Sequence, residues 1–166
     1  MKRYACPMGR KMLRKCSVVI LLVLLAACGS QEPFGTDQHG ALIPKALLDE
    51  QWLVINYWAI WCAPCRQEVP ELNELHHQLH SQGVRVLGVN YDQLQGAELL
   101  ADSQQLGIEF PVFSSDPAVH FNLPKTQGLP ATYIVNPHGQ LAGTMHGEQS
   151  KESILIALEQ LGWSSP

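Results

Sequence analysis

Residues 52–65 read WLVINYWAIWCAPC, and this stretch decides the fold. Its first half, residues 52–58, is mostly apolar and rich in β-branched and aromatic side chains, which predicts a strand buried on both faces. After Pro64 the apolar residues recur at steps of three and four, namely at Cys65, Val69, Leu72, Leu75 and Leu79. This period predicts one buried stripe along a helix of about four turns, with Pro70 inside it. A buried strand therefore runs into a helix, and two cysteines lie at the junction.

Strands and helices continue to alternate along the rest of the chain. We expect further strands over residues 84–91, 110–113, 131–135 and 140–146, and helices over residues 97–106 and 151–161. The turn at residues 136–139, which reads NPHG, predicts a hairpin between the last two strands. This order of elements predicts an α/β domain with a central mixed β-sheet flanked by helices.

The first 27 residues have the composition of a targeting signal. Basic side chains are concentrated up to Lys15, an apolar run covers residues 18–27, and no acidic residue precedes Glu32. The apolar run is too short to cross a bilayer as a stable helix, which favours the hydrophobic part of a secretory signal. Residues 25–28, which read LAAC, resemble a bacterial lipobox, whose cysteine is acylated and becomes the first residue of the mature protein.

The chain is therefore expected to have three parts. Residues 1–27 are predicted to be a lipoprotein signal peptide, and residues 28–40 a lipidated N-terminus and flexible tether. The lipid would be carried by Cys28, and residues 41–166 would form the folded domain on the outer side of a bacterial membrane. A plain signal peptide or an uncleaved anchor is the alternative interpretation of the N-terminus.

The predicted mature chain is acidic. From Cys28 onward it contains five basic and fifteen acidic side chains, a formal charge of −10. A protein with this negative charge repels the phosphate backbone of nucleic acids, so we exclude nucleic acids as partners.

Cysteine usage points to thiol chemistry. Cys6 and Cys16 would leave with the signal peptide and Cys28 would carry lipid, so only Cys62 and Cys65 remain in the mature domain. In an oxidising compartment, a single closely spaced pair is better interpreted as a reactive pair than as a structural crosslink. A thiolate at the start of a helix is stabilised by unpaired N–H groups and by the positive end of the helix dipole. We therefore expect Cys62 to attack a partner disulfide and Cys65 to resolve the mixed disulfide.

Two other uses of this pair are less well supported. An inert disulfide closing so few residues would gain little from loop entropy. Half of a zinc site would need partner ligands, and the sequence has no second Cys-x-x-Cys motif, so we expect no metal at the cysteines. His76 and His80 lie one helical turn apart and could hold a metal, but a solvated helix face is the favoured interpretation.

Two motifs resemble a known family. Residues 54–65 are similar to the active site of thioredoxin-like proteins, and residues 128–139, GLPATYIVNPHG, are similar to the segment in which that superfamily places its cis-proline. Together with residues 110–112, the resemblance is to the TlpA/ResA-like branch of exported, membrane-tethered thiol–disulfide reductases. It covers roughly residues 42–161, and residues 97–113 resemble the helix–strand insertion of this branch.

The resemblance implies a thioredoxin-like fold and a disulfide oxidoreductase that works without a cofactor. Its expected partners are exported protein thiols and disulfides, apocytochrome c among them, and a membrane thiol donor. The reductase direction is favoured. Pro130 would be cis and lie beside the cysteine pair, where the Leu129 backbone can meet an extended peptide. The residues expected to shape the site are Trp61, Ala63, Pro64, Leu129 and Pro130.

The chain departs from thioredoxin at one position. The buried aspartate that helps to move protons in thioredoxin aligns here with Asn56, which does not titrate. Asp92, which follows the next strand, is therefore a candidate for proton handling, although a surface turn residue is the favoured interpretation.

Two other functions remain as alternatives. A thiol peroxidase is possible on the same fold, but peroxiredoxins place their cysteine in a Pro-x-x-x-(Thr/Ser)-x-x-Cys setting, and residues 58–61 read WAIW instead. A copper-handling module could bind Cu(I) through two thiolates. The Sco-like copper proteins of this fold use Cys-x-x-x-Cys with a distal histidine, whereas the spacing here is Cys-x-x-Cys.

Overall fold

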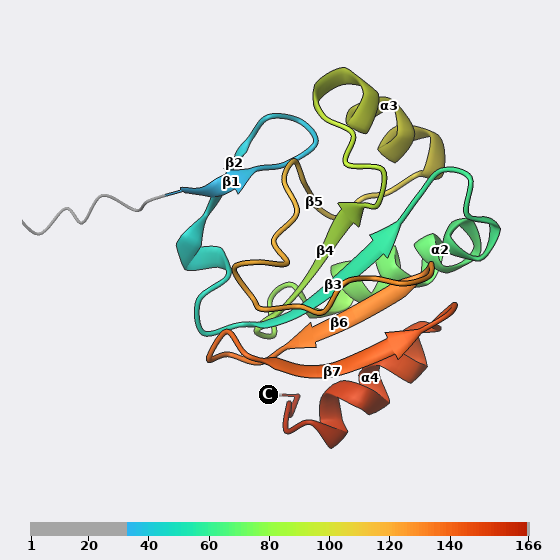
Figure 1. The fold of residues 1–166 in the computed structure, drawn as a ribbon. Coiled ribbons are helices and arrows are strands. Elements are labelled where there is room, and N and C mark those ends of the chain that lie inside the picture. Colours follow the sequence, from blue (N-terminus) through green and yellow to red (C-terminus); the bar gives the residue numbers. More distant parts are fainter. Residues whose placement is uncertain (1–32, 166) are drawn as a thin grey trace, which may run out of the picture. The chain divides into compact units, whose positions relative to one another are not determined.

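Five strands form one mixed sheet in the computed structural model, which describes residues 33–165 (Figure 1). The order across the sheet is β5-β4-β3-β6-β7. The strands are β3 (Trp52–Trp58), β4 (Val84–Asn90), β5 (Val112–Phe113), β6 (Ala131–Val135) and β7 (Leu141–His146). β3 pairs in parallel with β4 and antiparallel with β6, so the first predicted strand lies at the centre of the sheet. The predicted central mixed sheet is confirmed.

Two helices cover one face of this sheet. They are α2 (Ala63–Leu79) and α4 (Lys151–Gln160), whose buried residues pack on alternate side chains of the central strands. The stripe predicted from the sequence supplies this contact through Leu72, Leu75 and Leu79, each fully buried. Helix α3 (Gly96–Leu106) packs through Leu99 against Trp58 and Val112. These helices bear out the expectation of a sheet flanked by helices.

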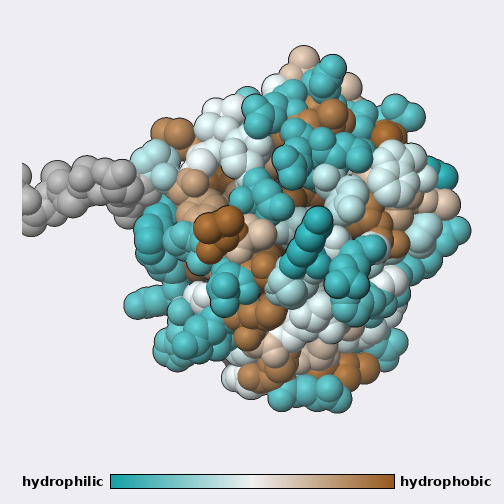
Figure 2. Space-filling view, in the orientation of Figure 1, coloured by the Kyte–Doolittle hydropathy of each residue, from teal (hydrophilic) through white to brown (hydrophobic). Residues whose placement is uncertain are grey.

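The other face is covered by an N-terminal hairpin and by residues 114–129. The hairpin consists of β1 (Pro33–Thr36) and β2 (Leu42–Pro44), and a short 3-10 helix, η2 (Lys45–Leu47), leads from it to β3. Phe34 of β1 packs against Phe113 and Phe121 on this face. Figure 2 shows the same side of the molecule, where apolar side chains in brown interrupt a largely hydrophilic surface.

The hairpin corrects the predicted tether. Residues 33–40 were expected to be part of a flexible tether, but Pro33–Thr36 form β1, which pairs with β2. The physical reason is the buried side chain of Gln38, whose amide donates to the carbonyl of Phe110 at 3.2 Å and accepts from the N–H of Val112 at 2.7 Å. The Gln38 side chain thus makes hydrogen bonds at the edge of β5 that a neighbouring strand would otherwise make.

Close packing between β4 and its neighbours requires a glycine. A Cβ atom at Gly88 would lie 2.9 Å from Cγ2 of Val112 and 3.0 Å from Nε1 of Trp58. The absence of a side chain at Gly88 therefore lets the indole of Trp58, the last residue of β3, pack closely against β4.

The N-terminal predictions lie outside the described residues. These are the signal peptide, the lipid on Cys28 and the first part of the tether. Within residues 33–165, no helix is both long and apolar enough to span a bilayer.

Candidate active site

The two candidate cysteines are joined at the first turn of α2. Cys62 and Cys65 form a disulfide with 5.3 Å between their Cα atoms. Cys62 is the N-cap residue of the helix, and its Sγ accepts a hydrogen bond from the N–H of Cys65 at 3.2 Å. Ala63 and Pro64 follow as the first two helical residues, where the missing N–H of proline removes no helical bond. The predicted position at the head of a helix is confirmed.

The disulfide is almost enclosed. Cys65 is fully buried and Cys62 retains 4% of its surface, so Cys62 is the more accessible of the two. Trp58, Ala59, Leu99 and Val112 complete the apolar cluster around the sulfurs. Cys62 is thus less exposed than expected, because α3 and the end of β3 close over it. A partner disulfide can reach it only through the small opening that remains.

A proline loop lies against the same cluster. The peptide bond between Leu129 and Pro130 is cis, as the resemblance implied, and Leu129 packs on the apolar cluster that holds the disulfide. β6 begins at the next residue, Ala131. The start of β6 therefore brings the backbone of residues 128–130 to the same side of the sheet as the cysteines.

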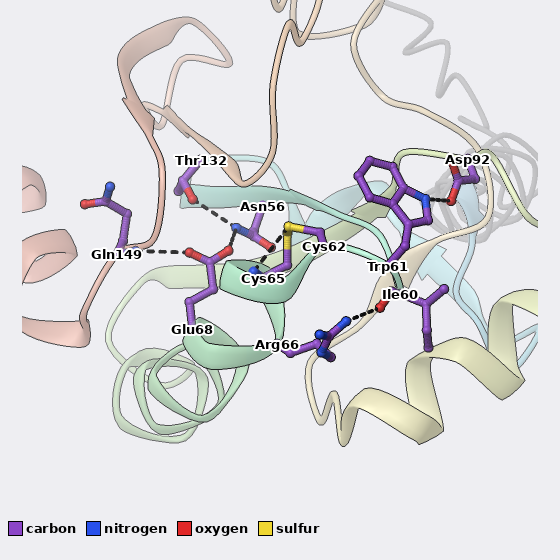
Figure 3. Close-up of a disulfide and its surroundings, with 10 residues drawn as sticks. All are labelled: Asn56, Ile60, Trp61, Cys62, Cys65, Arg66, Glu68, Asp92, Thr132 and Gln149. Carbon is purple, nitrogen blue, oxygen red and sulfur yellow. Dashed lines mark hydrogen bonds between the residues drawn. A yellow bond between two sulfur atoms is a disulfide. The ribbon is translucent and has the colours of Figure 1, made fainter.

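Trp61 is held by the residue predicted to handle protons. The Trp61 side chain is 60% exposed, and its Nε1–H donates to Oδ2 of Asp92 at 2.8 Å. Figure 3 shows Asp92 on the far side of Trp61 from the disulfide. The position of Asp92 therefore supports a role in orienting the indole and not the expected role in proton handling at Cys65.

The buried acid of the site is Glu68, which the sequence interpretation missed. Its side chain is fully buried one helical turn after Cys65. Oε1 accepts from Nδ2 of Asn56 at 2.7 Å, and Oε2 accepts from the N–H of Gln149 at 3.1 Å. The sequence did carry a signal, because position 68 lies on the same helix face as Cys65 and Leu72. A charged residue within an apolar stripe is an exception that needs a reason.

Burial makes Glu68 unusually basic for a carboxylate. Loss of solvent raises its pKa from 4.5 to about 7, and the hydrogen bonds from Asn56 and Gln149 only partly oppose this rise. The nearby charge of Glu148 raises the pKa further. Glu68 can therefore gain or lose a proton close to neutral pH, as a general acid or base requires.

Asn56 links this acid to the disulfide. Its Nδ2 donates to Glu68 and, at 3.1 Å, to Oγ1 of Thr132. In Figure 3 the Asn56 amide lies between the Glu68 carboxylate and the sulfurs. Its Oδ1 is buried and has no hydrogen-bond partner among residues 33–165, so it can accept a bond from a new donor such as a cysteine S–H.

The histidines of α2 do not share a common partner among residues 33–165. His77 pairs with Glu109, and Nδ1 of His80 is 2.9 Å from the carbonyl oxygen of His77. The rings of His76 and His80 have centroids 6.0 Å apart. Among residues 33–165, no three side chains of His, Cys, Asp or Glu are grouped so as to hold a metal ion.

The sequence and the fold are both similar to known proteins. Residues 31–144 match the AhpC/TSA family. The thiol-disulfide oxidoreductase ResA of Geobacillus thermodenitrificans strain NG80-2 is 29% identical over 163 residues, which cover 86% of this chain and 92% of the relative.

Two solved structures have a similar fold. A thiol:disulfide interchange protein of the thioredoxin family from Chlorobium tepidum TLS superposes with a TM-score of 0.65 at 23% identity, covering 77% of this chain and 92% of the other. A DsbF homologue from Corynebacterium diphtheriae gives a TM-score of 0.64 at 21% identity, covering 76% and 82%. The predicted thioredoxin-like fold is confirmed.

Proposed function

The chain belongs to the AhpC/TSA family, and from that premise we propose that it is an exported, membrane-anchored thiol–disulfide oxidoreductase that reduces disulfides of exported proteins. The observation that carries the proposal is the Cys62–Cys65 disulfide at the first turn of α2. The similarity to the thiol-disulfide oxidoreductase ResA along most of both chains supports the same activity.

The reaction starts from the dithiol form. The Cys62 thiolate attacks one sulfur of the partner disulfide and forms a mixed disulfide, while the other partner sulfur leaves as a thiolate. Cys65 then loses its proton and attacks the Cys62 sulfur, which releases the second partner thiol. Two electrons pass from the cysteine pair to the partner, and the Cys62–Cys65 bond forms again. The free N–H groups at the start of α2 stabilise the anion at Cys62.

Glu68 and Asn56 would manage the proton of Cys65. In the dithiol form the Cys65 S–H can donate to the free Oδ1 of Asn56, whose amide is also bonded to Glu68. An ionised Glu68 favours removal of the proton, because a carboxylate with a pKa of about 7 is a competent base near neutral pH. When the disulfide is restored, the carboxyl group holds a proton inside an apolar region at little cost.

The location and partners follow from the N-terminus. We propose that residues 1–27 are removed, that Cys28 carries lipid, and that the domain acts on the outer side of a bacterial membrane. Its substrates are then exported protein disulfides, such as those of apocytochrome c, and a membrane thiol donor restores the dithiol. No cofactor is required, because the cysteine pair carries both electrons.

The activity is tested with the purified full chain. The protein should reduce insulin disulfides with dithiothreitol as donor, Cys62→Ser should abolish this activity, and Cys65→Ser should accumulate a mixed disulfide with the substrate. Absence of reduction by the native chain, or full activity in Cys62→Ser, would contradict the proposal. The equilibrium of the pair with glutathione gives the direction, and a potential near that of strong oxidants would contradict a reductase.

Two further measurements separate the alternatives. Rapid consumption of hydrogen peroxide without a disulfide substrate would favour a thiol peroxidase, which the family match also accommodates. Retention of Cu(I) through purification, with no exchange activity, would favour a copper-handling module. Lipid on Cys28 is tested by the mass of the N-terminal peptide from membranes, and a Cys28→Ser chain should leave the membrane fraction.

A further inference from the structure

A groove runs beside the proposed active site and has no part in the reaction described above. It has a volume of about 590 Å³ and lies between the end of β3, the residues after β4, and residues 116–126. Tyr57 and Tyr91 contribute aromatic surface to its lining, and Val119 and Leu123 contribute aliphatic surface. Lys125 also lines it.

One contact relates the groove to the disulfide. The Tyr91 ring, which lines the groove, lies edge-on to the Trp61 ring with centroids 6.3 Å apart, and Trp61 directly precedes Cys62. Thr126, another lining residue, comes three residues before Leu129, which packs against the cysteine cluster. A polypeptide whose disulfide meets Cys62 and that extends over Trp61 therefore reaches the Tyr91 side of the groove.

Apolar surface is concentrated along this path. Among residues 33–165, six large apolar side chains are exposed, and three of them are Trp61, Tyr91 and Val119. Val119 is 94% exposed, so nothing within the described chain covers it. Large apolar side chains that are exposed next to a reactive centre are typical of a binding surface.

The backbone conformation of two residues that line the groove supports its interpretation as a binding site. Gln93 and Asn122 line the groove and have φ values of 57° and 52°, in the left-handed region. Asparagine adopts this region readily, but glutamine rarely does, and such residues are concentrated at functional sites. Each of the two loops that line the groove thus holds one non-glycine residue in the left-handed region.

The groove is lined by two charged side chains, Asp116 and Lys125, and they differ in whether they can bind a charged group of a partner. Oδ1 of Asp116 accepts from the Tyr57 hydroxyl at 2.6 Å and from the N–H of Ala118 at 2.9 Å. Its negative charge is therefore compensated by two donors. Lys125 makes no ion pair within residues 33–165, so its ammonium is free to bind an anion brought by a partner.

We infer that this groove binds the polypeptide segment next to the substrate disulfide and selects its sequence. A large apolar or aromatic side chain packs on Tyr91 and Val119, and an acidic side chain pairs with Lys125. The inference rests on the proposed function and deepens it, since it defines the substrates as polypeptides with an apolar and an acidic residue near the target cysteine.

The test uses the reduced full chain and synthetic peptides. Each peptide carries one cysteine as a mixed disulfide with glutathione in an alanine–glycine background. A single tyrosine, glutamate or lysine is placed in turn at each of the five positions on either side of the cysteine. One turnover gives peptide thiol, glutathione and the oxidised protein, and each rate is divided by the rate with bis(2-hydroxyethyl) disulfide. Tyrosine at its best position should raise this ratio about fivefold or more, which is the effect of burying part of one large apolar side chain.

Two variants and two matched controls complete the experiment. Val119→Ser should remove most of the tyrosine effect, and Lys125→Glu should reverse the preference from a glutamate to a lysine peptide. Ile156→Ser removes an exposed apolar side chain of α4, and Lys45→Glu makes the same change of charge in η2, so both should retain the native ratios. The inference is overturned if peptide sequence does not change the ratio, or if the controls behave like the groove variants. Failure of the native chain to reduce even the small disulfide would instead remove the proposed function on which the inference rests.

Discussion

Replacement of Glu68 by glutamine should change how stability depends on pH. In the folded chain the pKa of Glu68 is about 7, against an ordinary value of 4.5. Between these values the folded state binds more protons than the unfolded state, so the free energy of unfolding falls as the pH rises. Each pH unit of this interval is worth about 1.4 kcal/mol, and the whole interval is worth about 3 kcal/mol.

The assay is urea unfolding of the oxidised protein at constant ionic strength from pH 4 to pH 8. Glu68→Gln removes the titrating group and keeps the volume of the side chain. It also loses one acceptor facing Asn56 or Gln149, which shifts stability by a similar amount at every pH. The variant should therefore gain about 3 kcal/mol relative to the native chain as the pH rises across this range.

A matched control replaces a carboxylate that is exposed to solvent. Glu98 lies on the open side of α3, and Glu98→Gln should follow the native curve. The reasoning is refuted if the stability difference between Glu68→Gln and the native chain stays constant with pH. It is also refuted if the difference decreases, because that sign would mean that burial lowers the pKa of Glu68.

Three further predictions concern packing around the sheet. Gly88→Ala should destabilise the fold by about 1–3 kcal/mol in urea unfolding, because the new Cβ would lie 2.9 Å from Val112. Gln38→Ala should cost about 2 kcal/mol, since the buried N–H of Val112 and carbonyl of Phe110 lose their partner, and hydrogen exchange at Val112 should accelerate. Leu158→Ala should cost about 2–5 kcal/mol, because this fully buried side chain fills the space between α4 and the sheet.

Each of these three predictions would be contradicted by a different result. Native stability in Gly88→Ala would show that β4 and β5 separate without strain. Unchanged exchange at Val112 in Gln38→Ala would mean that water satisfies the edge of β5 without the glutamine. A loss below about 1 kcal/mol in Leu158→Ala would show that α4 collapses into the cavity or contributes little to the core.

The elements around the cysteines could be predicted because their signals are local. The change of apolar period after Pro64 depends only on which side chains each element buries, and the structure ends α2 at the predicted Leu79. The end of α3 was equally readable, since Gly107 adopts the left-handed conformation that closes a helix. The resemblance of residues 128–139 to a known motif supplied the cis bond before Pro130, which no propensity would have indicated.

The missed features depend on contacts between residues far apart in the sequence. Gln38 was assigned to a tether because its neighbours are polar turn formers, and its hydrogen bonds to Phe110 and Val112 cross more than 70 positions. Glu68 was overlooked for a similar reason, because its partners Asn56 and Gln149 come from two other parts of the chain. Asp92 was predicted to handle protons because it follows the end of a strand in the sequence. That position does not show in which direction its side chain points.

The side-chain bonds of Gln38 have a consequence for any shortened form of the protein. β5 lies at the border of the sheet, and without the hairpin its N–H and C=O groups would face solvent next to the apolar rings of Phe110 and Phe113. Such a border invites intermolecular strand pairing. A chain trimmed at residue 41 would keep its cysteines and still be prone to self-association, whereas one beginning before Pro33 would retain its own protective cover.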